Sequence, residues 1–441
     1  MSAEITRRKF LATTATTAAA IAAASEASAF APQAEPIRVG LIGCGGIMSS
    51  HVRRIVARGL PVEFTHLCDV DDHQPERRGI AKAISGFQKL EPRRTRNFEE
   101  VLEDKTVQAV IVATPHHQHA PIALPAMQAG KDIYLEKPGS HVFSEGPLYI
   151  AAAKKYSVVF QHGSQMRSSP VTESAGELLA SGIIGEVKMT KAWNCQNREV
   201  RKPVADAKPP AGVDYDRWLG PAPERPFNEN RFHQYWRVFR DYGNGDIGDD
   251  GIHDIDMARW GLGVTKHPNR ITAHGSTIAK QGDRDYPDNM MVAFHYDDGK
   301  VLLYEDRLFT PYGYRGFDSG NTFYGTEGYM IFSRRGYYQV YLGAKEKEGP
   351  TVPREIRGGA GRGYDEHMDN FLKCVRTRET ASCTPEIAHL SCSLVHLGEI
   401  AFRAQDVINF DPATETIQDN PAAAKLLTKT YRAPYGLPDT V

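Results

Sequence analysis

The chain has 441 residues, of which 41% are hydrophobic and 24% are charged, and its formal net charge is −1. This length and composition are typical of a globular protein with two or three domains. Positive and negative charges are interspersed, which does not support binding to nucleic acid or to a membrane surface. Beyond the first thirty residues, no run of the sequence approaches the roughly 20 apolar residues that a membrane span requires.

The first thirty residues have the features of an export signal. Residues 6–11 read T-R-R-K-F-L, a twin-arginine pattern, and a weakly apolar run of Ala and Thr follows it to Ala24. Residues 27–29, A-S-A, offer a cleavage site. We predict a signal peptide over residues 1–31, recognition by the twin-arginine export machinery, and a periplasmic or otherwise exported protein. The other interpretation of this stretch is a disordered, Ala-rich tail.

Residues 36–162 alternate short apolar runs with helical stretches. This is the pattern of a parallel sheet whose strands are connected by crossover helices. The expected strands are 38–42, 63–68, 109–113, 132–135 and one near 157–162. We therefore predict an N-terminal Rossmann domain that binds a dinucleotide.

A glycine-rich turn joins the first of these strands to a helix expected from Met48 to Ala57. Residues 38–48 read R-V-G-L-I-G-C-G-G-I-M. The first glycine of such a turn permits the tight bend, the second lets the backbone approach a diphosphate, and helix-end N–H groups point at the anion. Met48 stands where the third glycine of G-x-G-x-x-G would be. The turn residues predicted to bind the cofactor are Gly43, Gly45, Gly46, Ile47 and Met48.

Asp69 closes the next apolar run and lies 26 residues after Gly43. An acidic residue at this distance can accept both ribose hydroxyls of an adenosine. Its charge also repels a 2′-phosphate. The sequence therefore favours NAD over NADP.

The strand expected at 109–113 ends in T-P-H-H-Q-H, residues 114–119. A loop that leaves the carboxyl end of a sheet strand is where such folds hold a ligand. Its three histidines have no cysteine or carboxylate partner nearby, so contact with the cofactor or helix capping is favoured over metal binding. The six cysteines lack C-x-x-C spacing and are interpreted as small buried hydrophobes. No metal site is predicted.

The strand expected at 132–135 is followed by Glu136-Lys137-Pro138. This placement puts Lys137 at the carboxyl edge of the sheet, on the same side as the glycine turn. A fixed ammonium there can hydrogen-bond a substrate hydroxyl and stabilise charge on its oxygen. The alternative is an ordinary surface lysine.

Residues 163–403 change in character and read as a second domain for substrate binding and oligomerisation. Long alternating segments occur at 187–194, 270–278, 289–296, 301–308 and 322–332. D-D-G-K at 297–300 is a strong hairpin signal between two of them. We predict a largely antiparallel sheet with one face covering the first domain, helices in 364–403 that pack back on the first domain, and an irregular extension over 404–441.

Residues 242–263 form the second informative stretch. Asp249 is expected to begin a helix in which His253 lies one turn further on, so both side chains project from one face. Asp256 can also reach this face. The imidazole of His253 is a natural general base, because its ordinary pKa is near neutrality, and a neighbouring carboxylate can orient the ring. The alternative is a capping or paired histidine in a domain-interface helix, and His367 is interpreted as a structural histidine.

Together these motifs resemble the Gfo/Idh/MocA family of NAD(P)-dependent oxidoreductases. The resemblance covers residues 38–411 and rests above all on E-K-P at 136–138 and D-x-x-x-H at 249–253. It implies a Rossmann domain plus an α/β domain with an open, mainly antiparallel sheet, and a homodimer or homotetramer. It also implies that Lys137 is catalytic and that Asp249 and His253 form the substrate-side pair. The nicotinamide end would be lined by Thr114, Pro115, His119 and Glu136.

From this we predict hydride transfer between a nicotinamide cofactor and a hydroxyl carbon of a sugar, cyclitol or glycoside. His253 would take the hydroxyl proton with help from Asp249, and Lys137 would hold the reacting oxygen. The candidate sugar-contacting wall consists of Trp236, Arg237 and Tyr242, because aromatic and bidentate polar groups suit pyranose rings.

Exported members of the family resemble either glucose–fructose oxidoreductase, which retains its nucleotide, or NAD-dependent glycosidases, which oxidise a sugar transiently. Because the periplasm supplies no free NAD, we expect tightly bound cofactor. The glycosidase reaction is one alternative, although Lys137 argues against it. An inactive, cofactor-retaining scaffold is another.

Overall fold

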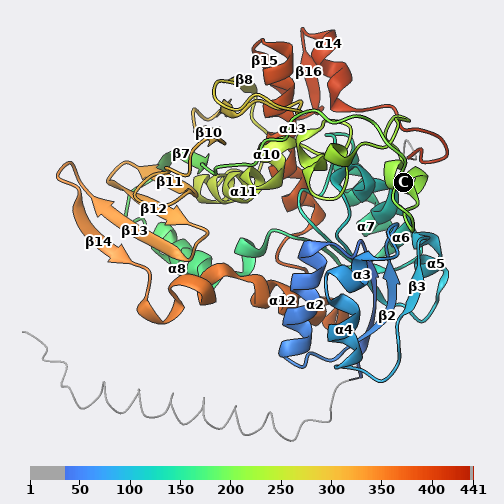
Figure 1. Ribbon diagram of the computed structural model, residues 1–441. Coiled ribbons are helices and arrows are strands. Elements are labelled where there is room, and N and C mark those ends of the chain that lie inside the picture. The colour runs from blue at the N-terminus through green and yellow to red at the C-terminus, as the bar shows by residue number, and fades with distance from the viewer. Residues whose placement is uncertain (1–34, 438–440) are drawn as a thin grey trace, which may run out of the picture.

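The protein consists of two sheets with helices packed on and between them (Figure 1). The structure is a computed structural model that describes residues 35–437 and residue 441. The predicted signal peptide, residues 1–31, lies outside the described residues. Within the described part of the chain, no helix is long and apolar enough to span a membrane.

The N-terminal sheet has six strands in the order β3-β2-β1-β4-β5-β6, and all pairs are parallel. Residues such as Val39, Leu41 and Ile111 are fully buried, as expected for strands that are covered on both faces by crossover helices. The strand order reverses between β1 and β4, and ligands of doubly wound sheets bind outside the carboxyl ends of the strands at such a point. The predicted Rossmann-type sheet is confirmed.

The elements of this first part follow in chain order. They are β1 (Ile37–Ile42), α2 (Gly46–Ala57), β2 (Val62–Cys68), α3 (Gln74–Arg77), α4 (Ile80–Ser85), β3 (Arg93–Thr95), α5 (Phe98–Glu103), β4 (Ala109–Val112), α6 (His119–Gln128), β5 (Asp132–Leu135), α7 (Glu145–Tyr156) and β6 (Phe160–His162).

The second sheet has ten strands in the order β14-β13-β12-β11-β7-β10-β9-β8-β15-β16. Its strands are β7 (Val187–Asn194), β8 (Arg270–Ser276), β9 (Asn289–His295), β10 (Val301–Arg307), β11 (Ser319–Gly325), β12 (Gly328–Ser333), β13 (Tyr337–Leu342), β14 (Lys347–Thr351), β15 (Ile408–Asp411) and β16 (Thr416–Gln418). Only the β7–β10 pair is parallel among the pairings described. The predicted mainly antiparallel sheet is confirmed, and D-D-G-K forms the β9–β10 turn.

Two details of this sheet differ from expectation. Residues 322–332 are not one strand, because a turn at 326–327 divides them between β11 and β12. Glycines flank the turn where the chain passes close to other backbone: a Cβ on Gly328 would lie 2.3 Å from the Tyr341 carbonyl oxygen. Residues 404–441 are not simply irregular either, since β15 pairs with β8 and extends the sheet.

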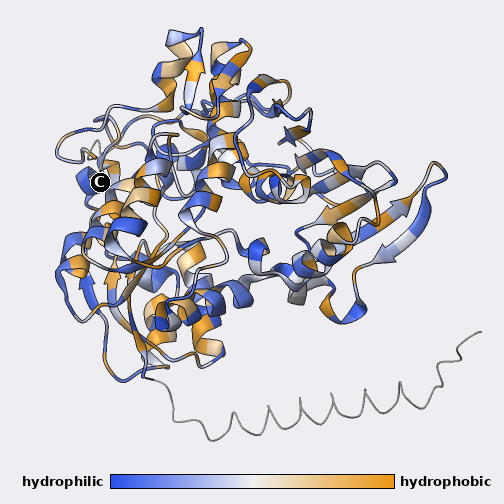
Figure 2. Cartoon of the chain, turned by 180° about the vertical axis from the view of Figure 1, so that it is seen from behind, coloured by the Kyte–Doolittle hydropathy of each residue, from blue (hydrophilic) through white to orange (hydrophobic). Residues whose placement is uncertain are grey.

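The remaining helices are α8 (Pro170–Ala180), α9 (Tyr215–Leu219), α10 (Gly245–Asp249), α11 (Gly251–Leu262), α12 (Tyr364–Thr377), α13 (Pro385–Ala404) and α14 (Pro421–Ala424). α11 lies on the second sheet, and α12 packs back on the first through Phe371 and Leu372. α13 contacts both α7 and β8 and so joins the two halves. The hydropathy colouring in Figure 2 shows hydrophobic segments in the strands of the first sheet and the helices beside them, and hydrophilic segments mainly at the periphery.

Candidate active site

A cavity of about 710 Å³ lies at the carboxyl ends of the first sheet, between that sheet and residues 195–250 of the second part. Most of the predicted site residues line it. They are Gly43, Gly45, Gly46, Ile47, Asp69, Thr114, Pro115, Glu136, Lys137, Trp236, Arg237, Asp249 and His253. The tertiary structure therefore brings together motifs that are separated by up to about two hundred residues in the sequence.

The glycine turn is shaped to admit a diphosphate. Gly43 has φ +84°, and a Cβ there would lie 2.8 Å from the backbone of Ala113, so only glycine fits without strain. A Cβ on Gly45 would meet no heavy atom within 4 Å, which shows that this residue borders open space. The first intrahelical bond of α2 runs from Ser49 N–H to the Gly45 carbonyl, leaving the N–H groups before it free for an anion.

Met48 differs from the prediction. Its side chain is fully buried in the core of the first domain and does not line the cavity. Because it occupies the first turn of α2 on the inner face, only its backbone N–H can contribute to anion binding.

Asp69 lies just beyond β2 and is held by the backbone. Its carboxylate accepts hydrogen bonds from the N–H groups of Cys44 at 2.6 Å and Asp71 at 2.9 Å. Burial raises the pKa of Asp69 to about 6, although these two hydrogen bonds oppose the rise. The carboxylate is thus fixed at the edge of the cavity, where an adenosine ribose of a dinucleotide would lie.

The histidine loop after β4 contributes a different histidine from the one expected. His119 does not line the cavity; its ring nitrogens lie 2.7 Å from the Pro138 carbonyl oxygen and 3.0 Å from the Thr114 carbonyl oxygen. It therefore holds two cavity-lining loops together. His116 faces the cavity instead and packs edge-on against Trp236, with ring centroids 4.7 Å apart.

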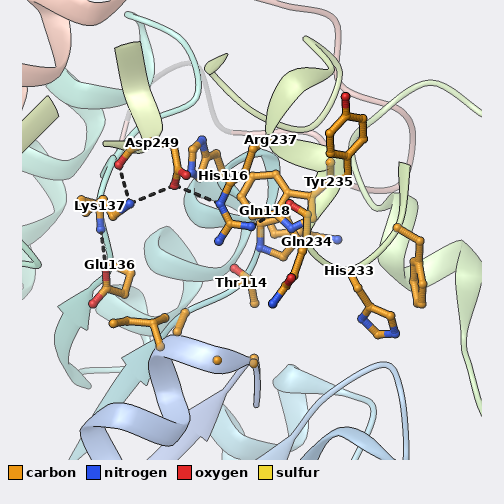
Figure 3. Close-up of a pocket in the computed structure, with 18 of the residues that line it drawn as sticks. Thr114, His116, Gln118, Glu136, Lys137, His233, Gln234, Tyr235, Arg237 and Asp249 are labelled. Carbon is orange, nitrogen blue, oxygen red and sulfur yellow. Dashed lines mark hydrogen bonds and ion pairs between the residues drawn. The ribbon is translucent and has the colours of Figure 1, made fainter. Parts of the chain in front are cut away.

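Lys137 is held by Asp249, as Figure 3 shows. Its Nζ donates to Asp249 Oδ1 at 2.9 Å and also to the Asp249 carbonyl oxygen. The Nε of Arg237 lies 3.0 Å from the same carboxylate oxygen. Burial raises the pKa of Asp249, but the two cations outweigh burial and lower it below the usual range. Asp249 is therefore an anion that positions a lysine and an arginine on the cavity wall.

The expected pairing of Asp249 with His253 is not present. Asp249 ends α10 and does not begin the longer helix, since the chain breaks at Asp250 before α11 starts. The glycines at 248 and 251 favour this break because they are poor helix formers. Asp256 also points elsewhere and binds Arg167 at 2.6 Å.

His253 is a neutral imidazole on the cavity wall. Burial, together with the positive charges of Arg334 and Lys137, lowers its pKa to about 3. Its Nδ1 is buried and has no hydrogen-bond partner in the described part of the chain. A neutral ring at this position can accept a proton from a bound hydroxyl.

Glu136 lies behind Lys137 and is also ionised. Its Oε1 is 2.7 Å from Nε2 of His51, and its Oε2 accepts the N–H of Lys137 at 3.2 Å. Burial raises the pKa of Glu136, whereas the hydrogen bond from His51 lowers it, and the result is about 2. His51, on α2, thereby fixes the residue next to the lysine.

Of the three residues predicted to contact the sugar, two line the cavity and one does not. Trp236 and Arg237 line the cavity, and the Arg237 guanidinium lies over the Trp236 ring at 4.5 Å. Tyr242 does not line it; this side chain is fully buried against Trp218 and His117. The glycines after Tyr242 turn the chain, so the aromatic ring faces the interior of the 213–242 cluster.

Other cavity residues were not foreseen, and Arg334 is the most informative. Its side chain is 8% exposed, its Nε donates to Ser319 Oγ at 2.9 Å, and its Nη2 lies 3.4 Å from Asp250 Oδ1 without forming a hydrogen bond. The residue follows β12 in a turn, and no local pattern signals its role. Arg198, Gln165 and Tyr364 also line the cavity.

His367 and the cysteines behave as interpreted from the sequence. The ring of His367 is buried, with Nε2 2.7 Å from the His162 carbonyl oxygen and Nδ1 2.8 Å from Ser168 Oγ. All six cysteines are buried and free. These residues lie outside the cavity wall, except for Cys68 at its edge.

Comparison with known proteins agrees with this fold and site. Residues 37–164 match the model of an oxidoreductase family with an NAD-binding Rossmann fold, and residues 181–323 and 361–437 match the C-terminal α/β domain of the same family. The fold and the cavity define an NAD-binding oxidoreductase. The chain belongs to the Gfo/Idh/MocA oxidoreductase family.

Two curated relatives span most of the chain. Levoglucosan dehydrogenase of Pseudarthrobacter phenanthrenivorans is 25% identical over 80% of this chain and 92% of its own length. The NAD⁺-dependent scyllo-inositol 2-dehydrogenase of Bacillus subtilis is 24% identical over 79% and 89%. A solved structure of levoglucosan dehydrogenase with NADH and levoglucosan has the same fold, with a TM-score of 0.65, 20% identity, and coverage of 85% of this chain and 99% of that one.

Proposed function

We propose that this protein oxidises a hydroxyl carbon of a sugar, cyclitol or glycoside with NAD⁺. The observation that carries the proposal is the meeting of the glycine turn, Lys137 and His253 in one cavity. The turn provides an anion cradle, the lysine provides an ammonium, and the histidine provides a neutral imidazole. The named dehydrogenases above act on hydroxyl groups of a sugar derivative and a cyclitol, which supports this substrate class.

The residues present fit a nicotinamide dinucleotide. Gly45 leaves room for a diphosphate, the N-terminus of α2 would hold it, and Asp69 would accept the ribose hydroxyls. The carboxylate of Asp69 repels a 2′-phosphate, so NAD is favoured over NADP. When bound, the nicotinamide accepts a hydride from the alcohol carbon. We further propose that the cofactor stays tightly bound through catalytic cycles.

The side chains then have distinct tasks. His253 takes the hydroxyl proton, because its imidazole is neutral over the physiological pH range. Lys137 uses an N–H donor not engaged by Asp249 to hold the substrate oxygen as charge develops on it. Asp249 positions Lys137 and Arg237. Arg237 and Trp236, which line the cavity, would contact the sugar ring.

We also propose export through the twin-arginine route and a homodimer or homotetramer. The twin-arginine pattern of residues 6–11 supports the first. The family resemblance supports the second, and the outer face of the second sheet, where Met291 on β9 is 56% exposed, is the candidate interface. Cell fractionation and light scattering of the purified protein test these two points; a cytoplasmic monomer would contradict both.

The decisive experiment measures NADH absorbance with a panel of sugars, cyclitols and glycosides. We expect turnover with NAD⁺ for the wild type and a loss of about 10²–10⁴-fold in kcat for Lys137→Ala, because an acid–base or electrostatic group is removed. Lys154→Ala, on the exposed face of α7, is the matched control and should retain activity.

Three outcomes would contradict the proposal. Equal rates for Lys137→Ala and wild type would remove the lysine from the reaction. Release of aglycone from a glycoside with no net NADH would instead indicate transient oxidation and glycoside cleavage, and absence of any turnover across the panel would favour a scaffold.

A further inference from the structure

Three metal-ligating side chains meet far from the cofactor cavity. His267 lies in the loop between α11 and β8, His389 in the first turns of α13, and Glu415 in the turn between β15 and β16. Nε2 of His267 is 3.0 Å and Nε2 of His389 is 3.1 Å from the same oxygen, Oε1 of Glu415. None of the three lines the cofactor cavity. Among the residues that the structure describes, no other group of three or more such ligands converges in this way.

The spacing of these atoms suits a tetrahedral metal ion. With bonds of about 2.0–2.2 Å, neighbouring ligand atoms of tetrahedral zinc stand about 3.3 Å apart. The two measured histidine–carboxylate distances are close to this, and all three ligand atoms lie within 4.8 Å of one another. Two histidines and one glutamate are a ligand set that zinc uses, with a water molecule in the fourth position.

The surroundings of these three side chains also suit a bound metal ion. The histidine side chains are each 4% exposed, whereas Glu415 is 33% exposed, which leaves one open side for entry of an ion and a water. The ring of Phe143 packs against both imidazoles, with centroids 5.6 Å from His267 and 5.0 Å from His389, so the inner side is dry. Nδ1 of His389 lies 3.3 Å from Ser393 Oγ, which can accept a hydrogen bond from Nδ1–H when Nε2 binds a metal.

We propose that His267, His389 and Glu415 bind one Zn²⁺, with a water molecule as the fourth ligand, and that the ion stabilises the folded chain. The ion ties the β15–β16 hairpin to α13 and to the loop before β8. The ion would add to the core packing and backbone hydrogen bonds of a hairpin whose ladder with β8 comprises only Ile408 and Asn409. A bound metal stabilises the folded state because the unfolded chain does not hold its ligands together.

The test uses the full-length protein without a histidine tag, first stripped with EDTA and then incubated with zinc chloride and desalted. Metal analysis is expected to find about one zinc per chain, because the three side chains form a single site. Zinc is also expected to raise the Tm. Glu415→Gln and His389→Gln keep polar groups of similar size but remove zinc ligands, so both should lose the bound zinc and the Tm rise.

His274→Gln, on the exposed end of β8, is the control and should behave as the wild type. Far-UV circular dichroism verifies that each variant is folded, and Glu415→Gln alters only a partly exposed side chain. A wild type that retains no zinc would overturn the proposal, as would equal zinc retention by both ligand variants. Bound zinc that leaves the Tm unchanged would overturn its structural role. The readout is independent of enzymatic activity.

Discussion

At the scale of single residues, the reactivity of the site depends on charges from distant segments. The positive charges of Lys137, from the first domain, and Arg334, from the turn after β12, both act on His253, and all three residues line the cavity. Both cations disfavour a proton on the imidazole, in addition to burial. Residues 324–360, which include Arg334, fall between the stretches that match the family's C-terminal domain. The match to the family's C-terminal domain therefore does not include this arginine.

The first prediction concerns Arg334. Replacing it with Met removes a positive charge near His253, so the imidazole pKa should rise from about 3 toward its ordinary value of about 6.5. A base with a raised pKa is protonated at higher pH. We therefore expect kcat/KM of Arg334→Met to fall between pH 7.5 and 5.5 more steeply than that of the wild type.

Arg335→Met is the matched control for this pH profile. Arg335 pairs with Asp318 at 2.7 Å and does not line the cavity. Its replacement should leave the profile unchanged. Identical profiles for Arg334→Met and the wild type would contradict the electrostatic role assigned to Arg334.

At the scale of secondary structure elements, two junctions determine the geometry of the site. The junction of β1 and α2 opens the anion cradle, and the break between α10 and α11 turns Asp249 toward Lys137 and separates it from His253. Spacing within a helix predicted that Asp249 and His253 would pair. The helix break overrides that spacing, because residues four apart face each other only within a continuous helix.

The second prediction tests the first junction. Gly45 has φ −79°, which any residue adopts, and a Cβ there meets no protein atom within 4 Å. Gly45→Ala should therefore keep the wild-type Tm, yet its methyl group would occupy space next to the diphosphate. We expect the Kd for NAD to rise about tenfold or more, equivalent to about 1.4 kcal/mol, as measured by calorimetry.

Gly86→Ala is the control, since Gly86 ends α4 with φ −82° and its Cβ would make only ordinary contacts at 3.8 Å. It should change neither the Tm nor NAD affinity. If Gly45→Ala bound NAD as tightly as the wild type, the diphosphate would not approach this turn.

At the scale of the whole molecule, the two domains bury many histidines in neutral form. Among the described residues, burial lowers the pKa of eleven histidines, to about 3 or 4 for five. The eleven are His66, His116, His117, His119, His141, His162, His233, His253, His267, His367 and His396. Five buried carboxyl groups have raised pKa values. Their effect on the pH dependence of stability is opposite to that of the histidines. They are Asp69, Asp246, Asp254, Asp306 and Glu399.

The third prediction follows from these pKa values. A histidine that is neutral when folded binds fewer protons than the same residue in the unfolded chain between about pH 4 and 6.5, so stability is lost as the pH falls through this range. Each such histidine costs about 1.4 kcal/mol at pH 5.5, one unit below its unfolded pKa. Because the histidines outnumber the carboxyl groups, we expect a lower free energy of unfolding at pH 5.5 than at 7.5, measured by urea denaturation.

A comparison of pH 7.5 with pH 8.5, where these histidines no longer titrate, should show no comparable change. Equal or greater stability at pH 5.5 would contradict neutral burial of the histidines. In that case the carboxyl groups with raised pKa values would outweigh the histidines in the pH dependence of stability.

Much of the fold and part of the site could be predicted from local patterns. The strands of the first sheet, the glycine turn and Lys137 at the end of β5 are signalled by short runs of sequence, because alternation, glycine placement and strand ends are local properties. His119 and Tyr242 were predicted at the cavity for the same kind of reason. Their rings turn inward, since a position in a loop does not determine which way its side chain points.

The amino-acid sequence by itself determined the parallel and antiparallel sheets and the edge of the first sheet at which a dinucleotide fits, because these follow from periodicity and turn chemistry within short segments. The tertiary structure decided which side chains become neighbours. Asp249 contacts Lys137, Arg334 lies beside Asp250, and Glu415 contacts two histidines. These partners are 26 to 148 positions apart in the sequence. Such contacts depend on the packing of whole domains, which no local pattern encodes.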